Sequence, residues 1–172
     1  MLSFGTDLLN CRLRQRRTTG VALVEVYDIG NGGNSILGNI STRAFVQTDD
    51  NVMIGGFIVQ GTGPKRVIIR AIGPELSQFG VPDPLANPTL ELHNAAGALI
   101  GSNDDWQHTN IGGVITHSQV ADIQNSGHAP ANPFESAIIA DLSPGNYTAI
   151  VTWCEQHHRS CSHGSVRPGL AT

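Results

Sequence analysis

The sequence predicts an all-β protein, folded as an antiparallel two-sheet sandwich within a single domain of the 172-residue chain. β-Branched and aromatic runs recur at a spacing of roughly 8–15 residues, separated by turn-forming residues and with little helical periodicity. The chain holds 20 glycines and 9 prolines, and only 14% of its residues are charged. This composition is typical of a folded domain and argues against a coiled coil or a disordered tail.

The first half of the chain contains four expected strands. Thr48–Asn51 reads as a hairpin loop between two of them, and Gly55-Gly56 indicates a bulge or a close backbone approach. In the fourth, Val67 and its alternate neighbours form an apolar face that we expect to be core. The expected strands are Val21–Ile29, Ile36–Val46, Val52–Gln60 and Lys65–Ile72.

The second half begins with one helical turn over Glu75–Phe79 and an extended, proline-rich loop over Val81–Pro88. Ser118–Gln124 predicts a short helix capped by Ser118, with Val120 and Ile123 facing inward. The expected strands are Leu90–His93, Ala98–Ile100, Ser136–Ala140 and Tyr147–Val151, the first and last pairs being joined by turns at Asn94–Gly97 and Leu142–Gly145.

The two ends of the chain differ in composition from the middle. Trp153–Thr172 is rich in His, Cys, Arg and Ser and shows a period of neither 2 nor 3.6. With suitable codons, a one-base shift of the reading frame turns the residues from Thr152 onward into a sequence close to Thr18–Gly30. We therefore interpret residues 1–17 as a non-native or disordered leader, 18–152 as the β-sandwich domain and 153–172 as a frameshifted, disordered tail.

The near-identity of these two sequences predicts a circularly permuted unit of a tandem repeat. Thr18–Gly30 would be the last strand of a preceding repeat, and it would fill the position that the altered tail leaves empty. If that position stayed open, the exposed sheet edge would favour a homodimer formed by strand exchange.

Charge and cysteine placement exclude several classes of protein. Between Thr18 and Thr152, four cationic side chains face twelve carboxylates, a net charge of about −8 that disfavours nucleic acid as a partner. The three cysteines, Cys11, Cys154 and Cys161, lie outside this span, so disulfides do not hold the body together. No apolar run is long enough to span a membrane, and no signal peptide is visible at the amino terminus.

Several short motifs occur in the order seen in bacterial pre-peptidase C-terminal domains. They are Leu90–His93, Gly97–Ile100, Ser102–Asp105, Glu135–Ile139 and Ser143–Thr148. Over residues 18–152 the chain also resembles a repeat unit of large secreted bacterial proteins. This resemblance implies a jelly-roll-like sandwich in an extracellular or cell-surface setting, with a structural or binding role beside neighbouring repeats, extracellular protein or glycan, and with Ca²⁺ as a ligand in some relatives.

The most specific candidate for a metal site is the acidic turn at Asn103, Asp104 and Asp105. It supplies hard oxygen ligands of the kind Ca²⁺ prefers, although it lacks the spacing of an EF-hand. The alternative is an Asx-turn in which Asn103 or Asp104 accepts hydrogen bonds from nearby backbone amides. Asp49 and Asp50 form a second candidate, which ranks behind the first.

Two further chemistries remain open from sequence. Scattered histidines at positions 93, 108, 117 and 128 have no zinc-motif spacing, and those of the tail, with Cys154 and Cys161, are explained by the frameshift. Trp106 would either stack on a sugar ring or seal the rim of the sandwich. We expect a non-catalytic module; the alternative is a Ca²⁺-dependent hydrolase of small esters or lactones that uses Asp105 and His108.

Overall fold

The computed structural model of the protein describes residues 19–30, 39–47 and 50–153. About half of the described residues lie in strands, and two short segments are helical. In chain order the elements are β1 (Gly20–Asp28), β2 (Asn39–Val46), β3 (Met53–Val59), β4 (Lys65–Ile72), the 3₁₀-helix η2 (Pro74–Phe79), β5 (Pro88–Asn94), β6 (Leu99–Asn103), α1 (Val120–Asn125), β7 (Ser136–Leu142) and β8 (Gly145–Trp153).

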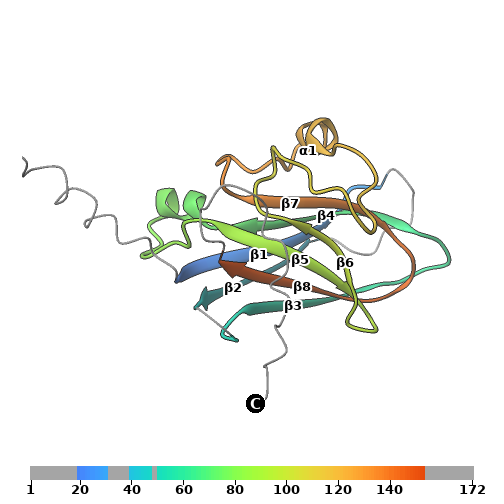
Figure 1. Ribbon diagram of the computed structural model, residues 1–172, viewed down its shortest axis with the longest axis horizontal. Helices are drawn as coiled ribbons and strands as arrows, with labels where there is room; N and C mark the ends of the chain where they lie inside the picture. The colour runs from blue at the N-terminus through green and yellow to red at the C-terminus, as the bar shows by residue number, and fades with distance from the viewer. Residues whose placement is uncertain (1–18, 31–38, 48–49, 154–172) are drawn as a thin grey trace, which may run out of the picture.

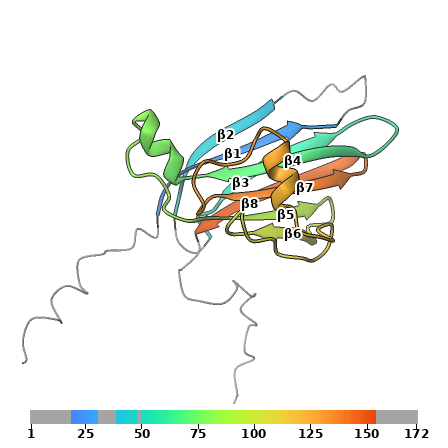
Figure 2. The same ribbon diagram turned by 90° about the horizontal axis from the view of Figure 1, so that it is seen from above.

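The strands are arranged in two four-stranded sheets that stack on each other (Figure 1). One sheet has the order β2-β1-β4-β7 and the other the order β3-β8-β5-β6, and every neighbouring pair is antiparallel. Figure 2, which is turned by a right angle, shows the strands lying along the length of the molecule. The predicted all-β sandwich is confirmed.

The main core lies between the two sheets, because the strands alternate apolar inward residues with outward residues. On β4 the face predicted to be core, which begins at Val67, is buried. From the other sheet, Leu90, Leu92 and Val151 are fully buried against it. The inward residues of the two central strands of the first sheet are Ala22, Val24, Val26, Val67, Ile69 and Ala71.

A second, smaller apolar cluster covers part of the outer face of the first sheet. Ile68 and Ile139 point outward there, and Trp106 and Ile123 cover them from the segment that carries α1. Figure 1 shows α1 lying over β7 and β4. Trp106 is 5% exposed and its indole N–H donates to the Asn132 carbonyl, so it seals the sandwich and has no free face for a sugar.

The short helix begins two residues later than the sequence predicts. Its N-cap is Gln119, whose side chain makes no capping hydrogen bond, so the predicted cap at Ser118 is wrong. The Gln119 backbone N–H instead donates to the Thr109 hydroxyl at 2.9 Å. The Thr109 hydroxyl, ten residues earlier in the chain, therefore satisfies a backbone donor at the start of the helix.

The glycine pair in β3 marks a close approach between the sheets. Pairing with β8 is continuous through Gly55 and Gly56, so the strand has no bulge there. A Cβ built on Gly55 would lie 2.9 Å from Cγ1 of Val24, whereas a Cβ on Gly56 would meet nothing within 4 Å. Gly55 thus gives the space that Val24 occupies in the core.

The strand near the amino terminus completes the first sheet. β1 pairs with β2 over Gly20–Tyr27 and with β4 over Leu23–Asp28. The described residues therefore form a continuous sheet at this position, and the open edge considered from sequence is absent from this part of the chain. Among the described residues, no helix has the length and apolar character needed to cross a membrane.

We predict that Gly55→Ala destabilises the fold, because the added methyl group overlaps Val24 and neither backbone can retreat within a packed core. The free energy of unfolding from urea titration should fall by about 1–3 kcal/mol. Gly56→Ala is the matched control and should change it by less than about 0.5 kcal/mol. In the double variant Gly55→Ala/Val24→Ala the two costs should fall short of additivity; equal effects of the two glycine substitutions would contradict this packing.

Candidate functional site

The candidate site is a groove on the outer face of the first sheet, beside the part of that face covered by Trp106 and α1. Outward-facing residues of β1, β2 and β4 form its floor. One wall is formed by η2 and by Val81, which lies just after it. Its volume of about 550 Å³ lies within the usual range for small-ligand sites.

One side of the groove is apolar. Leu23 of β1 lies beside Ile72 of β4, and the wall adds Leu76, Phe79 and Val81. Leu76 is buried, whereas the Phe79 side chain is 72% exposed at the rim. An exposed phenylalanine above an apolar floor is a common feature of ligand and partner sites.

The opposite side of the groove carries a cation. Arg43 of β2 is the register partner of Leu23, on the side away from Ile72. Two strand spacings therefore separate Arg43 from Ile72, about 10 Å of backbone. No described carboxylate lies within ion-pair distance of Arg43. The groove thus offers a cationic side chain on the strand next to its apolar side.

The centre of the floor is a polar network that is already satisfied. Arg70 pairs with Glu25 on the neighbouring strand, with Nε 3.2 Å from Oε2, and donates to the His128 carbonyl at 2.8 Å. The Tyr27 hydroxyl donates to Glu25 at 2.9 Å, and the Tyr27 ring stacks on His128 with 4.2 Å between ring centres. Burial, followed by the neighbouring Glu25, raises the pKa of Tyr27. These groups hold β1 and β4 in register.

A buried carboxyl group fixes the wall of the groove. Glu135 is fully buried, and its Oε1 accepts hydrogen bonds from the backbone N–H groups of Gly73 (3.2 Å) and Glu75 (2.8 Å), where η2 begins. Its Oε2 accepts from the Asn132 N–H at 3.3 Å. Burial outweighs these hydrogen bonds and raises the pKa of Glu135 to about 7.

The acidic turn proposed from sequence is built differently from a calcium loop. Asn103 is 3% exposed, and its amide donates to the carbonyls of Asp105 and His108 while its oxygen accepts from the Ala137 N–H at 3.1 Å. Asn103 therefore ties the turn to β7 and is not a free ligand. The Asx-turn considered from sequence would instead have the Asn103 oxygen accept from nearby backbone amides, whereas here that oxygen accepts from Ala137 in a distant strand.

The carboxylates of this turn are too few for a closed cation site on their own. Asp105 and His108 lie in one turn, since the His108 N–H donates to the Asp105 carbonyl at 2.8 Å. Burial and then Asp104 raise the pKa of Asp105, whose Oδ1 is buried and has no hydrogen-bond partner. In the described ranges no three His, Cys, Asp or Glu side chains converge as metal ligands. Calcium takes about six to eight oxygens, so most would have to be backbone carbonyls and water.

Two other sequence candidates are not brought into a described site. Asp49 lies outside the described residues, as do Cys154 and Cys161 of the tail. Asp50 is described and is exposed. His93 bonds to Glu91 within its own strand, at 2.9 Å, and His128 is stacked on Tyr27. The described histidines are therefore dispersed over the fold.

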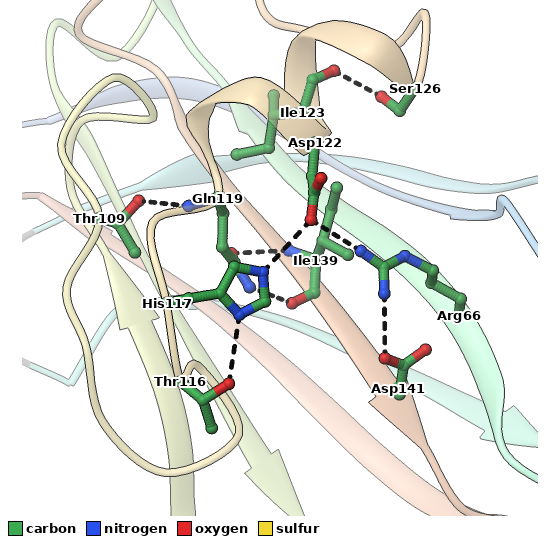
Figure 3. Close-up of polar contacts among 10 residues, drawn as sticks. All are labelled: Arg66, Thr109, Thr116, His117, Gln119, Asp122, Ile123, Ser126, Ile139 and Asp141. Carbon is green, nitrogen blue, oxygen red and sulfur yellow. Dashed lines mark hydrogen bonds and ion pairs between the residues drawn. The ribbon is translucent and has the colours of Figure 1, made fainter.

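A hydroxyl, an imidazole and a carboxylate do line up near α1 (Figure 3). His117 lies with Nδ1 3.2 Å from the Thr116 hydroxyl and Nε2 3.4 Å from Oδ2 of Asp122. Asp122 is also paired with Arg66 at 2.8 Å, which in turn contacts Asp141. The His117 side chain is 62% exposed and does not line the groove, so the row lacks the enclosed setting that acyl transfer requires.

Figure 3 also shows how the edge of β7 is protected. The Gln119 side chain donates to the Ile139 carbonyl and accepts from the Ile139 N–H at 3.0 Å. Together with Asn103 on Ala137, it satisfies outer backbone groups of β7 in the manner of an added strand. This edge is thereby closed to pairing with another chain.

Sequence reasoning missed the groove because its residues come from separate strands. Glu25 and Arg70 stand 45 positions apart and meet only through sheet register. A usable signal was present: each is a charged residue with apolar residues on both sides in its strand. Glu135 carries a similar signal, as an acidic residue directly before the apolar run of β7.

Comparisons with family models, curated protein sequences and solved structures give no match to this chain.

We predict that stability falls as the pH rises from about 4.5 to about 7. The folded state holds the Glu135 proton more strongly than the unfolded chain, since its pKa rises from 4.5 to about 7. Its stabilising contribution is present in full below the unfolded pKa and is lost as the pH passes the folded pKa, by at most about 3 kcal/mol.

Denaturant unfolding of the native chain and of Glu135→Gln at pH 4.5 and pH 8 measures this effect. The neutral glutamine should flatten the pH dependence over this interval. An unchanged slope in the variant would show that Glu135 titrates normally.

Proposed function

We propose that this protein is a non-catalytic binding module of an extracellular or cell-surface assembly, and that its ligand site is the groove above β1. The observation that supports this proposal is the pairing of an apolar wall, ending in the exposed Phe79, with the guanidinium of Arg43 across one strand. The groups beneath it are saturated by their own contacts, so the groove offers recognition and no activated nucleophile.

The chemistry of the groove favours a protein segment as its ligand. An apolar side chain fits against Leu23, Ile72 and Phe79, and a carboxylate on the same segment would pair with Arg43 on the neighbouring strand. Glycan recognition usually uses a flat aromatic platform, and the candidate Trp106 is buried elsewhere. A protein partner also agrees with the role in a repeat array that the resemblance to pre-peptidase C-terminal domains implies.

The extracellular setting, the jelly-roll-like topology and the permuted repeat remain part of this proposal. So does Ca²⁺ at Asp104 and Asp105, whose support is the buried, unpartnered Oδ1 of Asp105. A cation there would satisfy that oxygen and separate two neighbouring carboxylates. Backbone carbonyls and water would have to complete the shell.

We predict that 1-anilinonaphthalene-8-sulfonate, an aromatic anion of suitable size, binds the folded protein in the groove. Fluorescence titration should show about tenfold weaker binding for Phe79→Ala and for Arg43→Ala, a loss of about 1.4 kcal/mol each. Ile111→Ala is the matched control, since Ile111 is 70% exposed and lies outside the groove. Equal weakening by all three substitutions would show nonspecific binding and refute the site.

We predict that calcium raises the melting temperature of the native chain measured with and without EDTA, because a ligand that binds only the folded state stabilises it. At a hundredfold excess over Kd the gain is about 2.7 kcal/mol, and Asp104→Ala should abolish it. An ester-hydrolysis assay on the same samples tests the alternative. Turnover that is lost with EDTA and in His108→Ala would replace the binding proposal with a Ca²⁺-dependent hydrolase.

A further inference from the structure

Among the described residues the strands pair as one long ribbon, in which no strand after β8 pairs with β2. The β5–β6 hairpin forms one end of this ribbon. The antiparallel pair β4–β7 comes next along the ribbon, and the antiparallel pair β3–β8 follows it. The next pair outward would join β2 to a strand that comes after β8. In this chain the partner of β2 is β1, so β1 takes the position of a strand that follows β8.

The end of β8 and the start of β1 lie at the same end of the sandwich. Trp153 pairs with Pro88 in one sheet. Val21 exchanges backbone hydrogen bonds with Asp83 and Leu85, each at 2.8 Å. Leu85 and Pro88 are joined by at most about 11 Å of chain. A short connection from β8 would therefore reach the position of β1. With suitable codons, a one-base shift of the reading frame after Thr152 also permits a sequence close to that of β1.

The position between β2 and β4 has features that recognise β1 specifically. Gly55 leaves space for Val24, and a Cβ on Gly20 would lie 2.6 Å from the Leu85 nitrogen. Arg70 meets Glu25, which is 8% exposed, directly across the register. A small residue, a valine and a glutamate at these places fix both the identity and the register of the strand.

The connection from β1 to its own sheet is longer than a hairpin needs. Tyr27 and Asn39 are register partners, and a two-residue loop is enough to join neighbouring antiparallel strands. Ten residues, 29–38, separate β1 from β2 and reach up to about 36 Å when extended. The connection is thus long enough for β1 to be placed in a second molecule.

We propose that the position between β2 and β4 accepts β1 from a second copy of this chain, so that two copies exchange β1 and form a dimer. The strand contacts are identical in the closed monomer and in the exchanged dimer. Concentration therefore decides between them, with the dimer favoured as the protein approaches the millimolar effective concentration of a tethered strand. This proposal is independent of the ligand of the groove.

Cysteine pairing between chains tests the exchange. Val21 directs its backbone groups at Asp83 and Leu85, away from β2. It therefore forms the non-hydrogen-bonded kind of pair with Phe45, whose Cα spacing of about 4.5 Å suits a disulfide. Full-length Val21→Cys and Phe45→Cys proteins, each with the three native cysteines changed to serine, are unfolded together, refolded at about 1 mM and oxidised.

The expected result is a disulfide-linked heterodimer of the two variants. A parallel mixture of Val21→Cys with Ile58→Cys is the control, because Ile58 is 55% exposed and Phe45 51% exposed but Ile58 lies on the other sheet. The heterodimer yield should exceed the control by about tenfold. Equal yields, or a dimer without the Val21–Phe45 disulfide, would overturn the proposal. A third test is the double variant Val21→Cys/Phe45→Cys, oxidised at high dilution. Its failure to form the disulfide within one chain would also overturn the proposal.

Discussion

β1 lies in the interior of its sheet, with hydrogen-bonded neighbours on both sides. Its inward residues, Ala22, Val24 and Val26, are almost fully buried against the opposite sheet, and each such valine contributes about 1.5–3 kcal/mol of burial. Its outward residues, Leu23 and Glu25, form the middle of the groove floor. The core, the register of the first sheet and the candidate site therefore all require this one strand to be in place.

Two buried acidic side chains then determine the shape of the groove. Removing a carboxylate from water is costly unless hydrogen bonds or a cation compensate. Arg70 and Tyr27 provide this compensation for Glu25, whereas Glu135 has backbone N–H donors that offset only part of the cost. Glu25 and its partners align β1 with β4, whereas Glu135 holds η2 against the sheet. Binding at the surface thus depends on polar contacts beneath it.

The acidic turn illustrates why a ligand set is hard to read from a short motif. Asn103, Asp104 and Asp105 are all oxygen donors, and composition alone makes them equivalent. In the fold, Asn103 is turned inward to satisfy β7 while a carboxylate oxygen of Asp105 is buried without a partner. Alternation along a strand and the geometry of the turn, which depend on tertiary contacts, decide which oxygens remain available.

Periodicity and turn residues in the sequence were enough to determine an all-β sandwich, the bounds of Lys65–Ile72 and its core face, and the hairpin at Asn94–Gly97. These features depend on neighbouring residues, whose spacing repeats that of the strand. The helix cap at Gln119, the close approach at Gly55 and the Glu25–Arg70 pair were decided only by the tertiary structure. Each of them joins residues distant in the chain, and such contacts exist only once the strands have paired in register.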